Sequence, residues 1–172
     1  MNITLHRTLM VCMLAGALAL TIALVAAKDV SAAPSTELAG GATQISGVGS
    51  YDARCVPESV EGANYVILMT GDLQGCLYTF IETAESSPSG TFRETGTELF
   101  VASDGVSMFE TTYRFEAKYE DVSDPATEIF GRCQHPIVEG SGTGIYAVVT
   151  GIVFFKDDVE AGNFRYRGHL RF

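Results

Sequence analysis

Strict alternation of side-chain type between Ser107 and Glu120 is the feature that most constrains how this chain can fold. One set of alternate positions is mostly aromatic, and the other set is mostly charged. The two sets are Phe109, Thr111, Tyr113, Phe115, Ala117 and Tyr119, and Glu110, Thr112, Arg114, Glu116, Lys118 and Glu120. A period of two places each set on one face of a β-strand, whereas a helix would scatter the aromatic residues around its axis. The pattern therefore predicts a strand with one dry face.

Further strand-like segments lie on both sides of this one and are separated by short turns. The segments are 64–70, 75–83, 91–102, 127–135, 151–157 and 163–172. An eighth strand is expected near 47–54 or around 145–149, and long helical periodicity is absent. Many regular strands with short turns favour a closed antiparallel barrel or a sandwich. Because a barrel removes exposed sheet edges, we expect an all-β, eight-stranded antiparallel closed barrel.

A glycine-rich stretch, EGSGTGIYAVVTG, runs from Glu139 to Gly151 and raises the question of phosphate binding. A phosphate loop needs a strand before it and a helix N-terminus after it, so that amides and dipole converge on the anion. Here neither the lysine-containing P-loop spacing nor a full GxGxxG is present. We expect the glycines to serve tight turns and close backbone packing at the entry to a barrel strand.

The same stretch carries a resemblance. Gly142-Thr143-Gly144, Tyr146 and Gly151 resemble the GTG-[FY]-x-G-x-x-G stretch of the allene oxide cyclase and dirigent barrels, although Val148 stands where those families often have glycine. Residues 71–76, 131–136 and 166–169 look like stretches of uncharacterised secreted proteins grouped with that calycin-like fold. The resemblance covers roughly residues 64–172. It implies an eight-stranded barrel with an apolar lumen, often a trimer, and no cofactor, but fold alone does not imply activity.

The N-terminal third of the chain has the composition of an export signal followed by a loose arm. Residues 1–7 are weakly basic, residues 8–27 are uncharged, and small residues place cleavage after Ala27 or Ala33. An uncleaved membrane anchor is the alternative, because the apolar run could span a bilayer. We expect a signal peptide over 1–33, a flexible arm over 34–50, the barrel over 51–172, and a secreted protein.

The formal net charge is −10, which argues against nucleic acid as a partner because that affinity depends on Lys and Arg contacts to phosphates. The basic residues that stand out are Arg165, Arg167 and Arg171 near the C-terminus. A metal site is not expected, because the spacing of Cys133, His135 and His169 matches no known ligand pattern.

Three cysteines follow the signal, so an exported chain would form one disulfide and keep one thiol. We favour Cys76 with Cys133, since both lie in predicted strands that could be neighbours. The pairing of Cys55 with Cys76, which would staple the N-terminal arm, is nearly as plausible.

Carboxylates and aromatic residues share one face of the strand over 91–102. If that face is inside, Glu94 or Glu98 is a candidate general acid or base, and Arg132 could neutralise either carboxylate or grip an acidic ligand. A solvent-facing carboxylate or a structural ion pair is the alternative for each.

The predicted lumen would suit a small apolar molecule. Its expected lining is Tyr78, Phe80, Glu82, Phe92, Tyr113 and Phe115. Three functions therefore stay open: a binding module for an apolar ligand, a cofactor-free cyclase or isomerase, and a packed scaffold whose C-terminal arginine face meets a partner.

Overall fold

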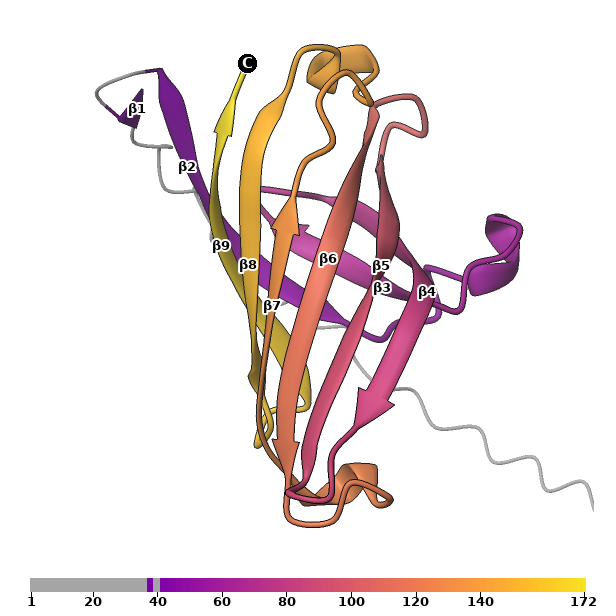
Figure 1. The fold of residues 1–172 in the computed structure, drawn as a ribbon. Helices are drawn as coiled ribbons and strands as arrows, with labels where there is room; N and C mark the ends of the chain where they lie inside the picture. The colour runs from indigo at the N-terminus through magenta and orange to yellow at the C-terminus, as the bar shows by residue number, and fades with distance from the viewer. Residues whose placement is uncertain (1–36, 39–40) are drawn as a thin grey trace, which may run out of the picture. The chain divides into compact units, whose positions relative to one another are not determined.

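The computed structural model describes residues 37–38 and 41–172, which form one nine-stranded antiparallel sheet (Figure 1). The strands are β1 (Glu37–Leu38), β2 (Ala42–Ser50), β3 (Tyr65–Gly71), β4 (Gly75–Ser86), β5 (Thr91–Ala102), β6 (Met108–Tyr119), β7 (Glu128–Pro136), β8 (Thr150–Asp158) and β9 (Asn163–Arg171). Three single-turn 3₁₀ helices connect them: η1 (Pro57–Ser59), η2 (Pro125–Thr127) and η3 (Gly144–Tyr146). Each strand pairs with the next along the chain.

The sheet closes because β2 also pairs with β9, in register from Ala42 opposite Arg171 to Gly49 opposite Phe164. Strands β2–β9 therefore form the eight-stranded antiparallel closed barrel that the alternation predicted, and β1 adds a two-residue pairing to β2. In Figure 1 the long strands β5–β9 run side by side, with η3 at one end and η2 at the other.

Seven strands agree with the predicted segments to within three residues at either end, and the eighth, β2, overlaps the expected segment 47–54 only over residues 47–50. It begins at Ala42, inside the segment expected to be a flexible arm, so the barrel starts before residue 51. Small residues suit this strand because the interior packs close to it. A Cβ added to Gly47 would come within 2.5 Å of the Tyr166 ring, and one added to Gly49 would come within 2.8 Å of Ile67. The predicted signal peptide, residues 1–33, lies outside the described residues.

Inward-facing side chains fill the barrel, and the glycine-rich loop covers one end of it. Tyr146 of η3 is buried, with its ring centroid 5.1 Å from that of Phe109 and 5.9 Å from that of Phe100. The loop is bonded to the β5–β6 hairpin: Thr143 N donates to Met108 O, and Ile145 N donates to Ser107 Oγ. The glycines therefore act sterically, as expected. Gly144 has φ +56°, and a Cβ there would lie 2.3 Å from Ser107 Oγ.

The disulfide joins Cys55 to Cys76, with a Cα–Cα distance of 5.8 Å, and Cys133 is a buried free thiol. The favoured pairing of Cys76 with Cys133 is therefore wrong. Strands β5 and β6 separate the two residues, and they face opposite sides of the sheet. Cys76 belongs to an outer apolar cluster with Cys55, Val66 and Tyr78, whereas Cys133 belongs to the interior. The disulfide holds the segment between β2 and β3 against the outside of the barrel.

Loss of this disulfide should destabilise the protein. The bond closes a loop with a sequence separation of 21, so replacing both cysteines with serine should lower the free energy of unfolding by about 3 kcal/mol. Guanidinium unfolding with and without reductant measures this. Reductant should weaken the wild type and leave the Cys55→Ser/Cys76→Ser variant unchanged; a wild type indifferent to reductant, or a non-reduced peptide map showing Cys76 joined to Cys133, would contradict the assignment.

Candidate functional site

A hydrogen-bonded network around Glu98 lies in the barrel interior. Glu98 Oε2 lies 2.5 Å from His135 Nδ1 and accepts a hydrogen bond from Thr111 at 2.7 Å, while Oε1 accepts one from Thr79 at 3.2 Å. These four residues are all buried. Both oxygens of the Glu98 carboxyl group thus have a partner, which offsets the cost of removing this polar group from water.

Glu94 also faces inward, four residues before Glu98 on β5. Its Oε1 accepts hydrogen bonds from Tyr113 at 2.8 Å and, more weakly, from Tyr65 at 3.4 Å. Burial, followed by the hydrogen bond to Glu94, raises the pKa of Tyr113 well above its ordinary value, so this phenol stays protonated. Both candidate carboxylates are therefore internal, as the alternation allowed, and both are held by neighbouring side chains.

The interior around Glu98 is closely packed. The cavity that touches Glu98 and His135 encloses about 10 Å³ and is otherwise lined mainly by apolar side chains, among them Phe100, Phe109 and Phe155. That volume is close to the minimum for a single water molecule, and far below the few hundred Å³ of a small-molecule site. The Glu98–His135 pair has the residue types of an acid–base dyad, but it has no room beside it for a substrate.

Three of the six expected lumen residues face inward and three do not. Phe92, Tyr113 and Phe115 are internal, and Phe92 packs edge-on against Phe115 with a centroid distance of 6.1 Å. Tyr78 and Phe80 instead belong to the outer cluster beneath the disulfide-held segment. Glu82 is exposed, at the register shift where β4 bulges between Ile81 and Thr83. The alternation along β4 explains why Tyr78 and Phe80 point outward. Leu77 and Thr79 point into the barrel, so the residues that follow each of them in sequence face the other side of the sheet.

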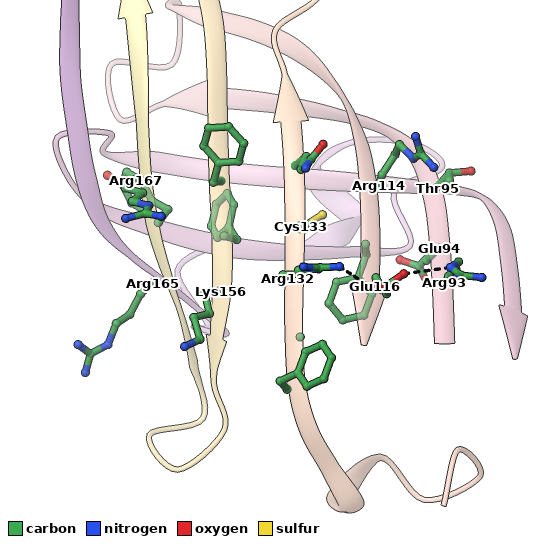
Figure 2. Close-up of a pocket in the computed structure, with 17 residues that line it drawn as sticks. Arg93, Glu94, Thr95, Arg114, Glu116, Arg132, Cys133, Lys156, Arg165 and Arg167 are labelled. Atoms are coloured by element: carbon green, nitrogen blue, oxygen red, sulfur yellow. Dashed lines mark hydrogen bonds and ion pairs between the residues drawn. The ribbon is translucent and has the colours of Figure 1, made fainter. Parts of the chain in front are cut away.

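Arg132 lies on the outer face and contacts neither interior carboxylate. Its Nη2 donates to Glu116 Oε1 at 2.8 Å, and Arg93 Nε donates to Glu116 Oε2 at 3.1 Å (Figure 2). The Arg132 side chain is 70% exposed. Arg132 therefore does not neutralise Glu94 or Glu98, because the β7 side chains that face inward are those of Cys133 and His135. It forms an ion pair with Glu116 on the outer face, in keeping with the alternative of a structural ion pair.

Arg132 belongs to one of two parallel rows of outward side chains that cross β5–β9. Residues directly opposite one another in the sheet form each row. The charged row is Arg93, Glu116, Arg132, Lys156 and Arg165. The mixed row is Thr95, Arg114, Gln134, Phe154 and Arg167. The rows are two residues apart along every strand, or about 7 Å.

These two rows line a groove that encloses about 1020 Å³. Its other lining residues are Phe130, Gly131 and the inward-facing residues between the rows: Glu94, Phe115, Cys133, Phe155 and Tyr166. Because these last five lie between the two rows on their strands, they form the floor of the groove. Figure 2 shows the labelled basic side chains arrayed over the strands that supply them. We call this feature the cationic groove.

Positive charge is concentrated in the cationic groove although the whole chain is acidic. Six of the chain's eleven Lys and Arg residues line it, against a single outward carboxylate, Glu116. Hydrogen bonds from Arg132 and then Arg93 hold the pKa of Glu116 below its ordinary value, so it stays ionised. Among the described residues, Arg114, Lys156 and Arg167 form no ion pair. Their charges are available to a ligand.

A second charged feature lies on the inner side of the β7–β8 pair. Asp157 and Glu128 crowd over Gly131, where an added Cβ would come within 2.1 Å of Asp157 Oδ2 and 2.7 Å of Glu128 Oε1. Burial, followed by the hydrogen bond and the charge of Glu128, raises the pKa of Asp157 to about 7. The described residues contain no group of three His, Cys, Asp or Glu arranged to hold a metal ion.

Comparison of the chain with protein-family models, with curated proteins and with solved structures gave no match. The resemblance to the allene oxide cyclase and dirigent barrels, and the trimer that it implies, therefore stay predictions from the motifs. Within the described residues, no helix is long and apolar enough to cross a membrane. The disulfide is typical of proteins that fold outside the reducing cytoplasm.

Sequence reasoning singled out Arg132, Arg165 and Arg167 among the six basic residues of the groove. The other three, Arg93, Arg114 and Lys156, lie on three different strands and become neighbours of these only through the register of the closed sheet. The sequence signal that could have found the others is the alternation of side chains: each basic residue lies between two inward-facing positions of its strand. Alternation assigns a residue to a face of the sheet, but only the pairing of strands aligns residues into rows.

The Glu98 network should act as a structural element. Replacing Glu98 with alanine leaves His135, Thr79 and Thr111 without their acceptor inside a packed core, and should lower the free energy of unfolding by about 3 to 5 kcal/mol. Urea unfolding measures this, with Glu110→Ala as a solvent-exposed control expected to change stability by less than about 0.5 kcal/mol. A Glu98→Ala protein as stable as the control would show that the network contributes little.

Stability should depend on pH through Asp157. Because the native state holds this proton more tightly than the unfolded chain, the free energy of unfolding should fall as pH rises from about 4 to about 7, then level off. Asp157→Asn should remove that slope and make the protein more stable than wild type at pH 8. Unfolding curves at pH 5 and pH 8 test this, with exposed Glu160→Gln as the control. An unchanged slope in Asp157→Asn would exclude Asp157 as the source.

Proposed function

We propose that this protein is a non-catalytic binding protein of an extracytoplasmic compartment, exported by its N-terminal segment, and that it holds an anionic ligand in the cationic groove. One observation carries the proposal: six basic side chains of an acidic chain converge on one face of five adjacent strands. Such a concentration of one sign of charge in a hollow raises the local concentration of ligands with the opposite charge.

The barrel supports this role as a rigid scaffold. Sites built on strands hold their side chains more precisely than sites on loops, and every residue of both rows lies within a strand. Arginine supplies five of the six charges, and its planar guanidinium suits bidentate binding of carboxylate, sulfate or phosphate groups. In the interior, the cavity of about 10 Å³ beside Glu98 gives little support to a bound apolar molecule or a substrate at that place.

Charge reversal at the groove should abolish binding. The double variant Arg114→Glu/Arg167→Glu removes two unpaired charges from the mixed row, and should bind a sulfated polymer such as heparin at least about tenfold more weakly than wild type. The measurement is a titration at low salt, together with elution from a heparin column. Both substitutions lie at exposed positions, so circular dichroism should show an unchanged fold.

The matched control is Arg54→Glu/Arg171→Glu, which changes the net charge equally at exposed positions outside the groove lining. This variant should keep most of the wild-type affinity. Equal loss in both double variants would mean that overall charge, and not the groove, governs binding, and the proposal would fail.

A further inference from the structure

The two rows of the cationic groove differ in chemistry, and the difference points to a class of ligand. Resting on the proposed function, we propose that the ligand is a linear acidic polysaccharide lying across β5–β9. Its carboxylate or sulfate groups meet the charged row, and its hydroxyl groups and ring C–H faces meet the mixed row.

The length of the groove favours a polymer over a single anion. The charged row crosses five strands, and four inter-strand spacings amount to about 19 Å. Its basic residues occupy β5, β7, β8 and β9, so no single phosphate or carboxylate can contact more than neighbouring members. Only a ligand with repeated negative charges can contact the whole row. Once one of its charges is bound, the next charges are held close to the remaining basic residues, so their effective concentration there is raised.

The mixed row provides what hydroxylated rings need. Gln134 lies between Arg114 and Phe154 in the row, and its amide can both donate and accept hydrogen bonds. Phe154 is partly exposed on the same face and offers an apolar ring beside these polar groups. Alternating charge, hydrogen-bonding groups and an aromatic surface match an acidic sugar chain, which presents charges, hydroxyl groups and C–H faces together.

Two other polyanions fit less well. Sites for single-stranded nucleic acid stack successive bases on a series of aromatic side chains, whereas this groove offers two exposed aromatic residues, Phe130 and Phe154, of which Phe154 alone lies within the rows. An anionic membrane presents a flat surface, whereas this site is a groove that encloses about 1020 Å³. The proposed export would place the protein among extracellular glycans.

The test measures the binding of three anionic probes, each at about 0.05 M and 0.2 M salt. A labelled oligogalacturonate long enough to span the five strands and a labelled single-stranded oligonucleotide of similar charge are followed by fluorescence anisotropy, and vesicles containing an anionic phospholipid are followed by co-sedimentation. We expect the oligogalacturonate to bind most tightly and neutral dextran not to compete. The full chain without its signal, with the disulfide formed, is the protein to use.

Two variants separate sugar recognition from charge. Gln134→Ala and Phe154→Ala keep every charge of the groove and alter exposed positions, so each should weaken oligogalacturonate binding about fivefold. Binding of the oligonucleotide should change less. Arg114→Glu/Arg167→Glu should weaken the binding of every polyanion that occupies the groove.

The outcomes distinguish this inference from the proposed function. Tighter binding of the oligonucleotide or the vesicles, still lost in the charge-reversed variant, would overturn the polysaccharide and leave an anion-binding groove. The inference also fails if Gln134→Ala and Phe154→Ala weaken the binding of oligogalacturonate and of oligonucleotide equally. The mixed row would then not distinguish a sugar chain from another polyanion. If no probe binds, or if charge reversal has no effect, both proposals fail.

Discussion

Pairing of β2 with β9 closes the sheet, and the rest of the structure depends on that closure. Eight residue pairs join the two strands, and Tyr166 of β9 reinforces the seam from inside. Its hydroxyl accepts a hydrogen bond from Leu73 N at 2.8 Å and donates to Thr70 O, which fixes the β3–β4 turn against the barrel. Once the sheet is closed, each strand has one inner and one outer face, and no residue can exchange them without shifting a whole register.

Closure has opposite effects on the two sets of side chains. The inner set must fill a narrow space, and it does so with aromatic residues, Glu94, Glu98 and the plug at Tyr146. Most polar groups of the Glu98 network bond to one another, although His135 Nε2 is buried without a hydrogen-bond partner. Away from the outer apolar cluster of Cys55, Val66 and Tyr78, the outer set has few packing demands, and cross-strand alignment collects its basic residues into rows. The interior thus stabilises the barrel, while the outer face provides groups able to bind a ligand.

The fold could be predicted from the sequence because period-two alternation and short turns reveal strands locally, and seven of the eight barrel strands were found in this way. The strand β2 was predicted only in part, as 47–54, one of two places expected for the eighth strand. Its glycines and small residues resemble a linker, although they serve close packing against Tyr166 and Ile67. Parity placed Glu94 and Glu98 on one face with Phe92 but could not say that Tyr78 and Phe80 point outward. The disulfide and the groove both depend on which strands become neighbours, a long-range property that no local pattern contains.

The concentration of positive charge in one groove affects how the protein encounters charged ligands in solution. The formal charge of the chain is −10, yet six basic residues line one groove of the described barrel. A polyanion is attracted toward this groove and repelled by the net negative charge of the chain, so the encounter is oriented before contact. Such steering acts over about a Debye length, roughly 8 Å at physiological ionic strength, and it makes the association rate, more than the lifetime of the complex, sensitive to salt.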